Sequence, residues 1–169
     1  MKRLLSIFFV VFFALAVPPV AAQDAASFRD TDLPLPRFAS LRSDKVYMRA
    51  GPGLRYPIRW VYRRENLPME IIQEFDSWRK IRDYDGEEGW VHQSLLSGLR
   101  TVMVRGEDGP LPVREKPEEN ARMVVRLEPT VIAKAEKCQP DWCRIEVGGY
   151  KGWIEKKVLW GIYDDEELD

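Results

Sequence analysis

The second half of this chain repeats the landmarks of the first half. Four short segments recur in the same order at offsets of 63 to 65 residues. The matched pairs are Met48-Arg49 with Val113-Arg114, Trp78-Arg79-Lys80-Ile81 with Trp142-Cys143-Arg144-Ile145, Gly89-Trp90-Val91 with Gly152-Trp153-Ile154, and Gly98 with Gly161. Because Trp and Gly are scarce residues, the agreement indicates a duplicated unit of about 55 to 60 residues.

Each unit carries the sequence pattern of a small β-structure. Residues 78–82 alternate apolar and charged side chains, as a half-buried strand does, and Asp85-Gly86 then supplies a tight hairpin turn. The second unit repeats the pattern with residues 143–147 and a Gly148-Gly149 turn. No segment carries a long 3.6-residue period. The sequence therefore predicts an all-β protein with two small barrels in tandem.

The N-terminus has the features of a secretory signal peptide. After a basic start, residues 4–17 form an apolar run that would span roughly 21 Å as a helix, short of the roughly 30 Å of a hydrocarbon core. Pro18 and Pro19 end this run, and the small residues Val20-Ala21-Ala22 follow. We therefore expect cleavage after Ala22 and export to the periplasm, with an uncleaved anchor as the alternative.

These features divide the chain into five predicted segments. Residues 1–22 are the signal peptide, and residues 23–43, with Leu33-Pro34-Leu35-Pro36, are expected to form an extended linker. The two domains span residues 44–99 and 100–163. Residues 164–169 hold five acids in six positions, which is typical of a solvated, disordered tail. Because residues 99–104 have the pattern of a strand rather than a hinge, we expect the domains to pack together.

The two cysteines predict a structural disulfide. Cys138 and Cys143 flank a four-residue loop that contains Pro and Asp, which suits a hairpin. Cross-strand Cβ atoms lie about 4.5–5.5 Å apart, close to the roughly 3.8 Å that a disulfide requires. Export to an oxidising compartment favours the bond. Redox activity and zinc binding are weaker alternatives, because four residues separate the cysteines and His92 is the only histidine.

The composition argues against nucleic-acid binding and against catalysis. Without Lys2 and Arg3, the 26 Lys+Arg become 24 against 27 Asp+Glu, so the mature chain has a net charge near −3 and no broad positive field. A single histidine excludes multi-histidine metal sites and leaves little room for a Ser-His-Asp or Cys-His arrangement. We therefore predict a non-enzyme with no catalytic residues, no cofactor and no metal site.

The ordered landmarks resemble the bacterial SH3-like (SH3b) domains of exported proteins. Residues 46–53 look like the opening V-x-x-R-x-G-P-G segment of that family, and Trp78 and Gly89-Trp90-Val91 follow in the family order. The second unit is similar to the copy that carries a Cys pair in tandem proteins, although residues 114–118 lack the Gly-Pro-Gly. The resemblance covers about residues 44–162. It implies small barrels of five or six strands and a binding or targeting role in the cell envelope.

The same resemblance places a ligand groove between the first long loop and a later hairpin loop, with aromatic side chains along it. In this chain the first long loop alternates aromatic residues with arginines, which stack on sugar or peptide planes and pair with carboxylates. The candidate ligand-binding residues are Arg55, Tyr56, Arg59, Trp60 and Tyr62. The alternative is a solvated basic strand with Trp60 packed inward. Arg49 and Arg114, at matched places, are expected to bond nearby carbonyls.

These expectations describe a non-catalytic exported binding module of the cell envelope that recognises peptidoglycan or a cell-wall peptide. The alternative is a periplasmic protein–protein interaction or regulatory adaptor that docks a peptide by its groove or an edge strand. The predicted partner is accordingly a cell-wall glycopeptide or an envelope protein. Nucleic acid and stable membrane insertion after signal cleavage are not expected, and the sequence leaves the oligomeric state open.

Overall fold

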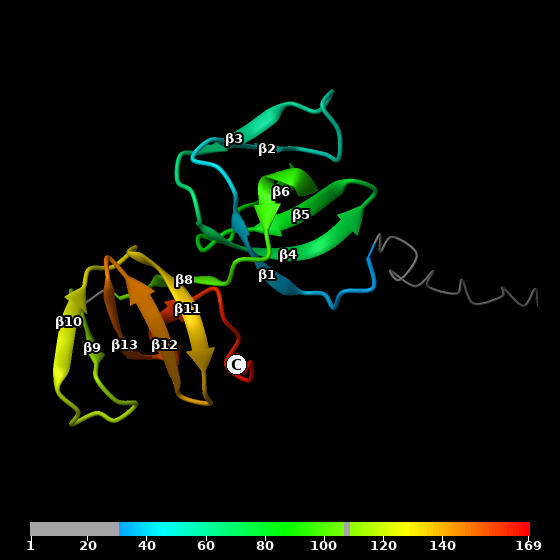
Figure 1. Ribbon diagram of the computed structural model, residues 1–169. Coiled ribbons are helices and arrows are strands. Elements are labelled where there is room, and N and C mark those ends of the chain that lie inside the picture. The colour runs from blue at the N-terminus through cyan, green and yellow to red at the C-terminus, as the bar shows by residue number, and fades with distance from the viewer. Residues whose placement is uncertain (1–30, 107–108) are drawn as a thin grey trace, which may run out of the picture.

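The computed structural model describes residues 31–106 and 109–169, so the predicted signal peptide and the first residues of the predicted linker lie outside the described residues. The described chain forms two antiparallel sheets of seven strands each, joined by turns and short 3-10 helices (Figure 1). The predicted all-β class is therefore confirmed.

The first sheet follows the order β3-β2-β6-β5-β4-β1-β7. Its strands are β1 (Arg37–Leu41), β2 (Val46–Arg49), β3 (Ile58–Tyr62), β4 (Pro68–Phe75), β5 (Trp78–Arg82), β6 (Glu88–His92) and β7 (Leu96–Ser97). The 3-10 helix η2 (Gln93–Leu95) links β6 to β7. The sheet has two ends, β3 and β7, so it does not close into the predicted barrel. Only one residue pair, Arg49 with Trp90, joins β2 to β6.

The second sheet has the same topology, with each position held by the strand seven places later in the chain, in the order β10-β9-β13-β12-β11-β8-β14. Its strands are β8 (Thr101–Val104), β9 (Leu111–Arg114), β10 (Met123–Leu127), β11 (Ile132–Cys138), β12 (Trp142–Val147), β13 (Tyr150–Glu155) and β14 (Leu159–Trp160), with η3 (Lys156–Val158) before β14. The repeat seen in the sequence is therefore a duplicated fold.

Two of the repeated glycines allow strands to approach closely. A Cβ atom on Gly89 in β6 would lie 2.5 Å from Cγ of Met48 and 2.9 Å from the carbonyl oxygen of Arg49. A Cβ atom on Gly152 in β13 would lie 2.6 Å from the carbonyl oxygen of Arg114. A side chain at either place would push the first hairpin of its unit away from the sheet. Glycine recurs at this offset for that steric reason.

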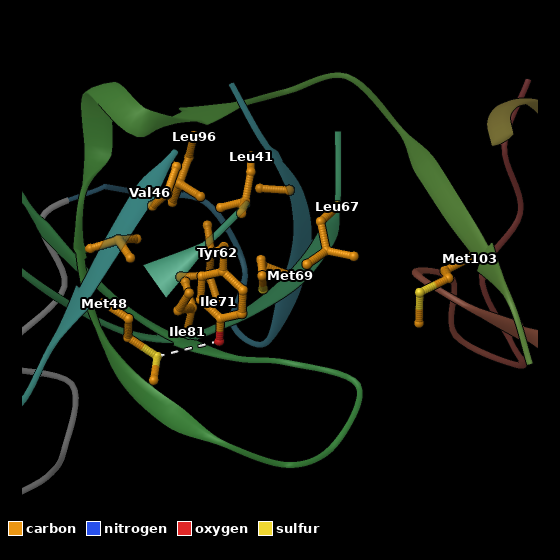
Figure 2. Close-up of a cluster of buried hydrophobic side chains, with 12 residues drawn as sticks. Leu41, Val46, Met48, Tyr62, Leu67, Met69, Ile71, Ile81, Leu96 and Met103 are labelled. Atoms are coloured by element: carbon orange, nitrogen blue, oxygen red, sulfur yellow. Dashed lines mark hydrogen bonds between the residues drawn. The ribbon is translucent and has the colours of Figure 1, made fainter. Parts of the chain in front are cut away.

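Each sheet has a core of its own, and residues of the second unit also pack against the first core. Leu41, Met48 and Ile81 are among the fully buried residues of the first core (Figure 2). Met103 lies on β8 of the second unit, yet it is 1% exposed and belongs to the first cluster. The two units therefore share buried apolar surface, which stabilises by roughly 25 cal/mol for each Å² removed from water.

Polar contacts also join the units. The Trp160 Nε1–H donates to the carbonyl oxygen of Pro68 at 3.1 Å, and the rings of Trp160 and Phe38 pack edge-to-face at 5.1 Å. The hydroxyl oxygens of Ser40 and Thr101 lie 2.6 Å apart in a hydrogen bond. The prediction that the two domains pack together is confirmed.

The predicted linker at residues 23–43 is wrong in its last part. Residues 37–41 form β1, which lies between β4 and β7 and is almost wholly buried. Leu41 faces the first core, while Phe38 and Ser40 face the second unit. A strand that is covered on both faces has no polar–apolar alternation, so its sequence carried no strand pattern.

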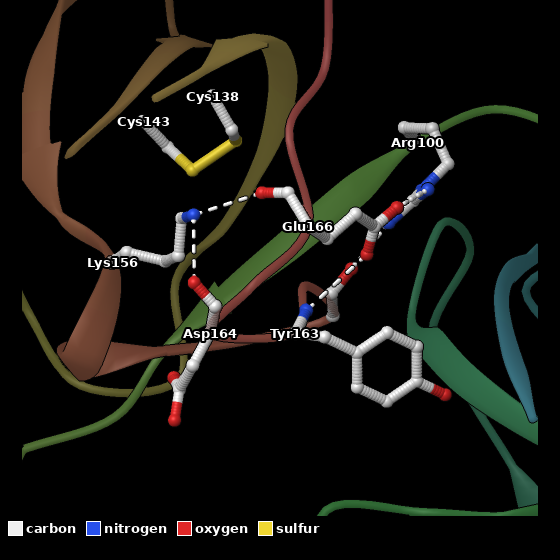
Figure 3. Close-up of a disulfide and its surroundings, with 8 residues drawn as sticks. Arg100, Cys138, Cys143, Lys156, Tyr163, Asp164 and Glu166 are labelled. Atoms are coloured by element: carbon white, nitrogen blue, oxygen red, sulfur yellow. Dashed lines mark hydrogen bonds and ion pairs between the residues drawn. A yellow bond between two sulfur atoms is a disulfide. The ribbon is translucent and has the colours of Figure 1, made fainter. Parts of the chain in front are cut away.

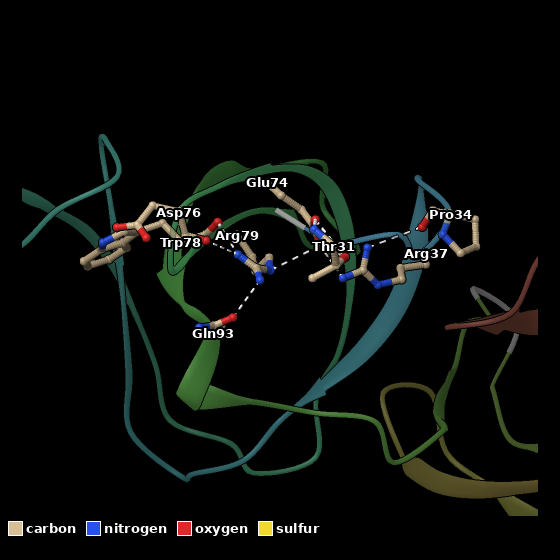
Figure 4. A network of polar contacts seen from close by, with 8 residues as sticks. All are labelled: Thr31, Pro34, Arg37, Glu74, Asp76, Trp78, Arg79 and Gln93. Atoms are coloured by element: carbon tan, nitrogen blue, oxygen red, sulfur yellow. Dashed lines mark hydrogen bonds and ion pairs between the residues drawn. The ribbon is translucent and has the colours of Figure 1, made fainter. Parts of the chain in front are cut away.

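A buried ionic cluster holds the residues just before β1 against the sheet (Figure 4). The Glu74 carboxylate is fully buried and pairs with Arg37 at 2.5 Å and with Arg79 at 3.2 Å. The Thr31 N–H donates to the same carboxylate at 2.8 Å. Burial opposes ionisation of Glu74, but the hydrogen bonds from Arg37 and Thr31 outweigh it and hold its pKa below the ordinary value.

The disulfide between Cys138 and Cys143 is present, as predicted. The two cysteines face each other across β11 and β12, with Cα atoms 4.1 Å apart, and both are buried. The bond closes the hairpin tip of the second unit, where the first unit has no equivalent cysteines.

The acidic tail is not the solvated, disordered end that the sequence predicted (Figure 3). Cys138 and Leu168 exchange two backbone hydrogen bonds of 2.9 and 3.1 Å. The buried Lys156 amine donates to the carbonyl oxygens of Glu166 at 2.8 Å and Asp164 at 3.1 Å. The Glu166 carboxylate pairs with Arg100. Cys138 and Lys156 bond the backbone of the tail, and Arg100 lies far from it in sequence. The count of acidic residues in the tail therefore did not reveal these contacts.

Candidate functional site

A hollow of about 190 Å³ lies beside the edge strand β3. It is bordered by Trp60, Arg63 and Arg64 on the hairpin side, by Tyr84 and Asp85 from the β5–β6 turn, and by Met103 from β8. The first long loop and a later hairpin turn therefore meet here, at the place where the family resemblance expected a groove.

Trp60 is the most prominent side chain at this hollow. It is 55% exposed, which contradicts the alternative that it packs inward. The pairing of β2 with β3 shifts by one residue between Met48–Trp60 and Arg49–Ile58, so Arg59 is the extra residue of a β-bulge. Bulges redirect side chains at sheet edges. Trp60 thus presents an aromatic face to solvent from a strand that is hydrogen-bonded on one side only.

Tyr62 does not offer a contact surface, although the sequence placed it among the candidate ligand-binding residues. Its side chain is 5% exposed in the first core, and its hydroxyl donates to Oδ2 of Asp83 at 2.8 Å. The other oxygen of Asp83 accepts the N–H groups of Asp85 at 3.0 Å and Glu87 at 2.9 Å. Burial, and then the Asp83 carboxylate, raise the pKa of Tyr62 well above its ordinary value. Tyr62 therefore positions the turn that forms one wall.

Three other candidates lie away from the border of the hollow. Tyr56 sits at the hairpin tip with its ring over Gly51, where an added Cβ would come within 2.5 Å of the ring. The Arg55 guanidinium lies 5.4 Å from the centre of the Tyr56 ring. Arg59 donates to the carbonyl oxygen of Glu88 at 3.4 Å. The structure therefore gathers Trp60 and Tyr62 and leaves Arg55, Tyr56 and Arg59 along the outer hairpin.

The repeated arginines have the structural role that the sequence predicted. Arg49 donates to the carbonyl oxygens of Leu54 at 3.1 Å and Tyr56 at 2.8 Å, which fixes the first long loop. Arg114 donates to the carbonyl oxygen of Ala121 at 3.0 Å and fixes the equivalent loop of the second unit.

Sequence reasoning missed two residues at the hollow. Tyr84 stands between two acids in the β5–β6 turn and is half-buried, and burial followed by Asp85 raises its pKa. Its position in the turn that faces the first loop could have identified it as a residue of the hollow. Met103 left no signal, because it reaches the hollow only through the packing of the two units.

The second unit does not rebuild this arrangement. Val125 pairs with Val113 as Trp60 pairs with Met48, so a half-buried valine takes the place of the exposed tryptophan. A larger hollow of about 600 Å³ does lie in this unit, between the first loop and the disulfide hairpin. Its lining holds five acidic residues against two lysines, so its net character is acidic; these residues are Glu118, Glu119, Asp141, Glu155, Asp164, Lys156 and Lys157.

The described residues contain neither a metal-binding cluster nor a membrane-spanning helix. Within residues 31–106 and 109–169, no three His, Cys, Asp or Glu side chains gather closely enough to hold a metal ion. In those same ranges, no helix has both the length and the apolar character required to cross a bilayer.

Two seven-stranded sheets of identical topology, with a groove beside the first long hairpin, define a tandem SH3-like protein. The bacterial SH3 domain family matches residues 42–98 and 107–161. The chain therefore belongs to the bacterial SH3 domain family, as the sequence resemblance implied.

Individual relatives are more distant. The chain is 25% identical over 131 residues to the "Putative N-acetylmuramoyl-L-alanine amidase YrvJ" of Bacillus subtilis (strain 168), a match that covers 72% of this chain and 25% of that protein. The chain thus spans about a quarter of the length of this curated relative. NlpC2 from Trichomonas vaginalis is 13% identical with a TM-score of 0.34, over 74% of this chain and 48% of that one. NlpC1 from the same organism is 12% identical with a TM-score of 0.34, over 81% and 50%.

Proposed function

We propose that this protein is an exported, non-catalytic binding module of the cell envelope that recognises peptidoglycan or a cell-wall peptide with its first unit. The observation that carries the proposal is the exposed Trp60 on an edge strand, beside a hollow that Arg63 and Arg64 border. An exposed indole face stacks on sugar or peptide planes, and guanidinium groups pair with the carboxylates of stem peptides.

Three further observations support this proposal. The Asp83 carboxylate at the hollow already accepts hydrogen bonds from Tyr62, Asp85 and Glu87, so it is poorly placed to act as a general base. A buried disulfide suits an oxidising compartment outside the cytoplasm. The matched relative is named a "Putative N-acetylmuramoyl-L-alanine amidase", and N-acetylmuramoyl groups occur in peptidoglycan.

The test is co-sedimentation of oxidised residues 23–169 with purified, protein-free peptidoglycan. We expect saturable binding that Trp60→Ala weakens by about tenfold or more, as for an aromatic anchor at an interface. Met123→Ala is the matched control, because Met123 is 47% exposed on β10, the strand equivalent to β3. This control is expected to bind as wild type does. Absence of binding by the wild-type protein would refute wall recognition.

One observation favours a second candidate, the docking of a partner peptide by strand addition. β3 ends the first sheet, so one of its edges is free to pair with an extended chain. Backbone pairing tolerates side-chain changes, so a partner captured from envelope extracts by crosslinking would bind Trp60→Ala and Arg59→Ala variants as well as wild type. Wall binding by the groove would not survive the loss of Trp60.

A further inference from the structure

The first hairpin and its flanks carry a concentrated positive charge. Residues 42–65 contain seven Lys and Arg against two Asp and Glu, a net charge of +5 in a chain whose overall charge is −1. The matching segment of the second unit, residues 107–130, contains four Lys and Arg against six Asp and Glu, a net charge of −2. The two copies of this hairpin therefore differ in charge far more than in fold.

Within the part of the chain that the structure describes, no ion pair neutralises the positive charge of the first hairpin. Among residues 31–106 and 109–169, none of its seven cations lies within ion-pair distance of a carboxylate. The cations of β5, farther into the same sheet, are paired instead: Lys80 lies 2.6 Å and Arg82 2.8 Å from the Glu88 carboxylate. The sheet therefore balances its own charges, whereas the hairpin leaves its charges to solvent.

The effect on a neighbouring group agrees with this distribution. Tyr47 is exposed on β2, with the Lys45 ammonium 5.3 Å from its ring centre. The hydrogen bond from Lys45, helped by the positive charges of Arg63 and Arg49, lowers the pKa of Tyr47. The hairpin surface thus stabilises a negative charge placed on it.

The cations follow one another along the hairpin. Arg55 lies in the turn before β3, Arg59 lies within β3, and Arg63 and Arg64 come directly after it and border the hollow. The five residues of β3 alone span roughly 17 Å, so these four arginines, here called the arginine track, are spread along the hairpin and do not form a single anion pocket. A linear polymer that carries repeated oxyanions would contact several of them at once.

Resting on the proposed function, we infer that the β2–β3 hairpin binds an anionic wall polymer through its oxyanions, which are carboxylates or phosphates. Trp60 stacks on the polymer, and the arginine track neutralises its charge. The acidic hollow of the second unit repels such a polymer, so binding is confined to the first unit.

The test compares two triple variants in sedimentation with wall sacculi at increasing salt. Arg59→Gln, Arg63→Gln and Arg64→Gln together remove three track charges. Arg122→Gln, Arg126→Gln and Lys134→Gln together remove three charges from the second unit. Each exposed ion pair contributes up to roughly fivefold in affinity. We therefore expect the track variant to lose about tenfold or more and to show a flatter salt dependence, with the control within about twofold of wild type.

Chemical treatment of the sacculi identifies the source of the oxyanions. Hydrofluoric acid removes phosphodiester-linked polymers, and carbodiimide amidation neutralises carboxylates. Loss of binding after either treatment supports the inference and names the group. Binding that depends on Trp60 but ignores salt, both treatments and the track variant would overturn the inference and leave the proposed function intact.

Failure of all wall binding would refute the proposed function and, with it, a wall polymer as the ligand. The fluorescence anisotropy of labelled polyglutamate and polyphosphate then tests separately whether the hairpin is an oxyanion-binding surface. Binding of either probe that the track variant weakens would support an oxyanion surface, and binding of neither would overturn it.

Discussion

Replacing Trp160 by alanine tests whether the two units fold as one body. Trp160 belongs to the second sheet, yet its indole N–H donates to the Pro68 carbonyl oxygen of the first unit at 3.1 Å and its ring packs on Phe38 at 5.1 Å. The ring is also packed against the first core. Because the contacts of this side chain lie across the junction, the substitution weakens the junction more than either sheet.

The expected loss follows from these contacts. The hydrogen bond contributes about 0.5–1.5 kcal/mol, and the edge-to-face ring pair contributes a similar amount. Burial of half an indole, about 100 Å², adds roughly 2.5 kcal/mol. We expect Trp160→Ala to lower the free energy of unfolding by about 3.5–5.5 kcal/mol. Trp160→Phe keeps an aromatic ring and removes the donor, so its expected loss is about 1 kcal/mol.

The assay is urea unfolding of oxidised residues 23–169, followed by circular dichroism and by tryptophan fluorescence. Wild type is expected to unfold in one transition seen equally by both probes, and limited proteolysis at Arg100 or Arg105 is expected to release no stable halves. Two separate transitions in wild type, or a loss below about 1 kcal/mol in Trp160→Ala, would refute the shared core.

Three other outcomes follow from the structure. Deletion of residues 164–169 leaves the buried Lys156 without its two carbonyl acceptors, so urea unfolding should show a loss of about 2–4 kcal/mol. Because the pKa of Glu74 is held below its ordinary value of 4.5, the ionised carboxylate stabilises the fold above pH 4.5, and this stabilisation is lost as the pH falls through the lowered pKa. The free energy of unfolding should therefore fall more steeply with acid for wild type than for Glu74→Gln. Gly161→Ala should lower the melting temperature, since a Cβ there meets the Thr101 carbonyl oxygen at 2.5 Å, whereas Gly98→Ala, with nothing within 4 Å, should not.

The elements that were predictable from the sequence are those set by local pattern. Trp78 and Ile81 of β5 are buried as the strand pattern predicted, and the repeat identified the matching strand β12 in the second unit. Arg79 departs from the pattern, because it is buried and pairs with Glu74. Cys138 and Cys143 flank a short turn, so their pairing followed from hairpin geometry. The structural role of Arg49 followed from its recurrence at the place of Arg114.

The candidate site was predictable only in part. Trp60 and the arginines that follow it stood out, because aromatic and cationic residues alternate in a loop that the fold exposes. Tyr62 belongs to the same alternation, but its ring enters the core and meets Asp83. Trp60 and Tyr62 pair with Met48 and Val46 in an unbroken register, so both rings belong to the same face of β3. They differ only in how much of the fold covers them, which the sequence does not show.

The sequence by itself determined the duplication, the strand pattern, the disulfide and the excess of positive charge in the first hairpin. Tertiary structure alone decided that β1 is a covered strand, that the acidic tail docks, and that Met103 and Trp160 join the two cores. The physical reason is the distance along the chain over which each kind of interaction acts. Turns, alternation and repeats act over a few residues, whereas the partners of Leu41, Lys156 and Trp160 are chosen by the surfaces that two folded sheets bring together.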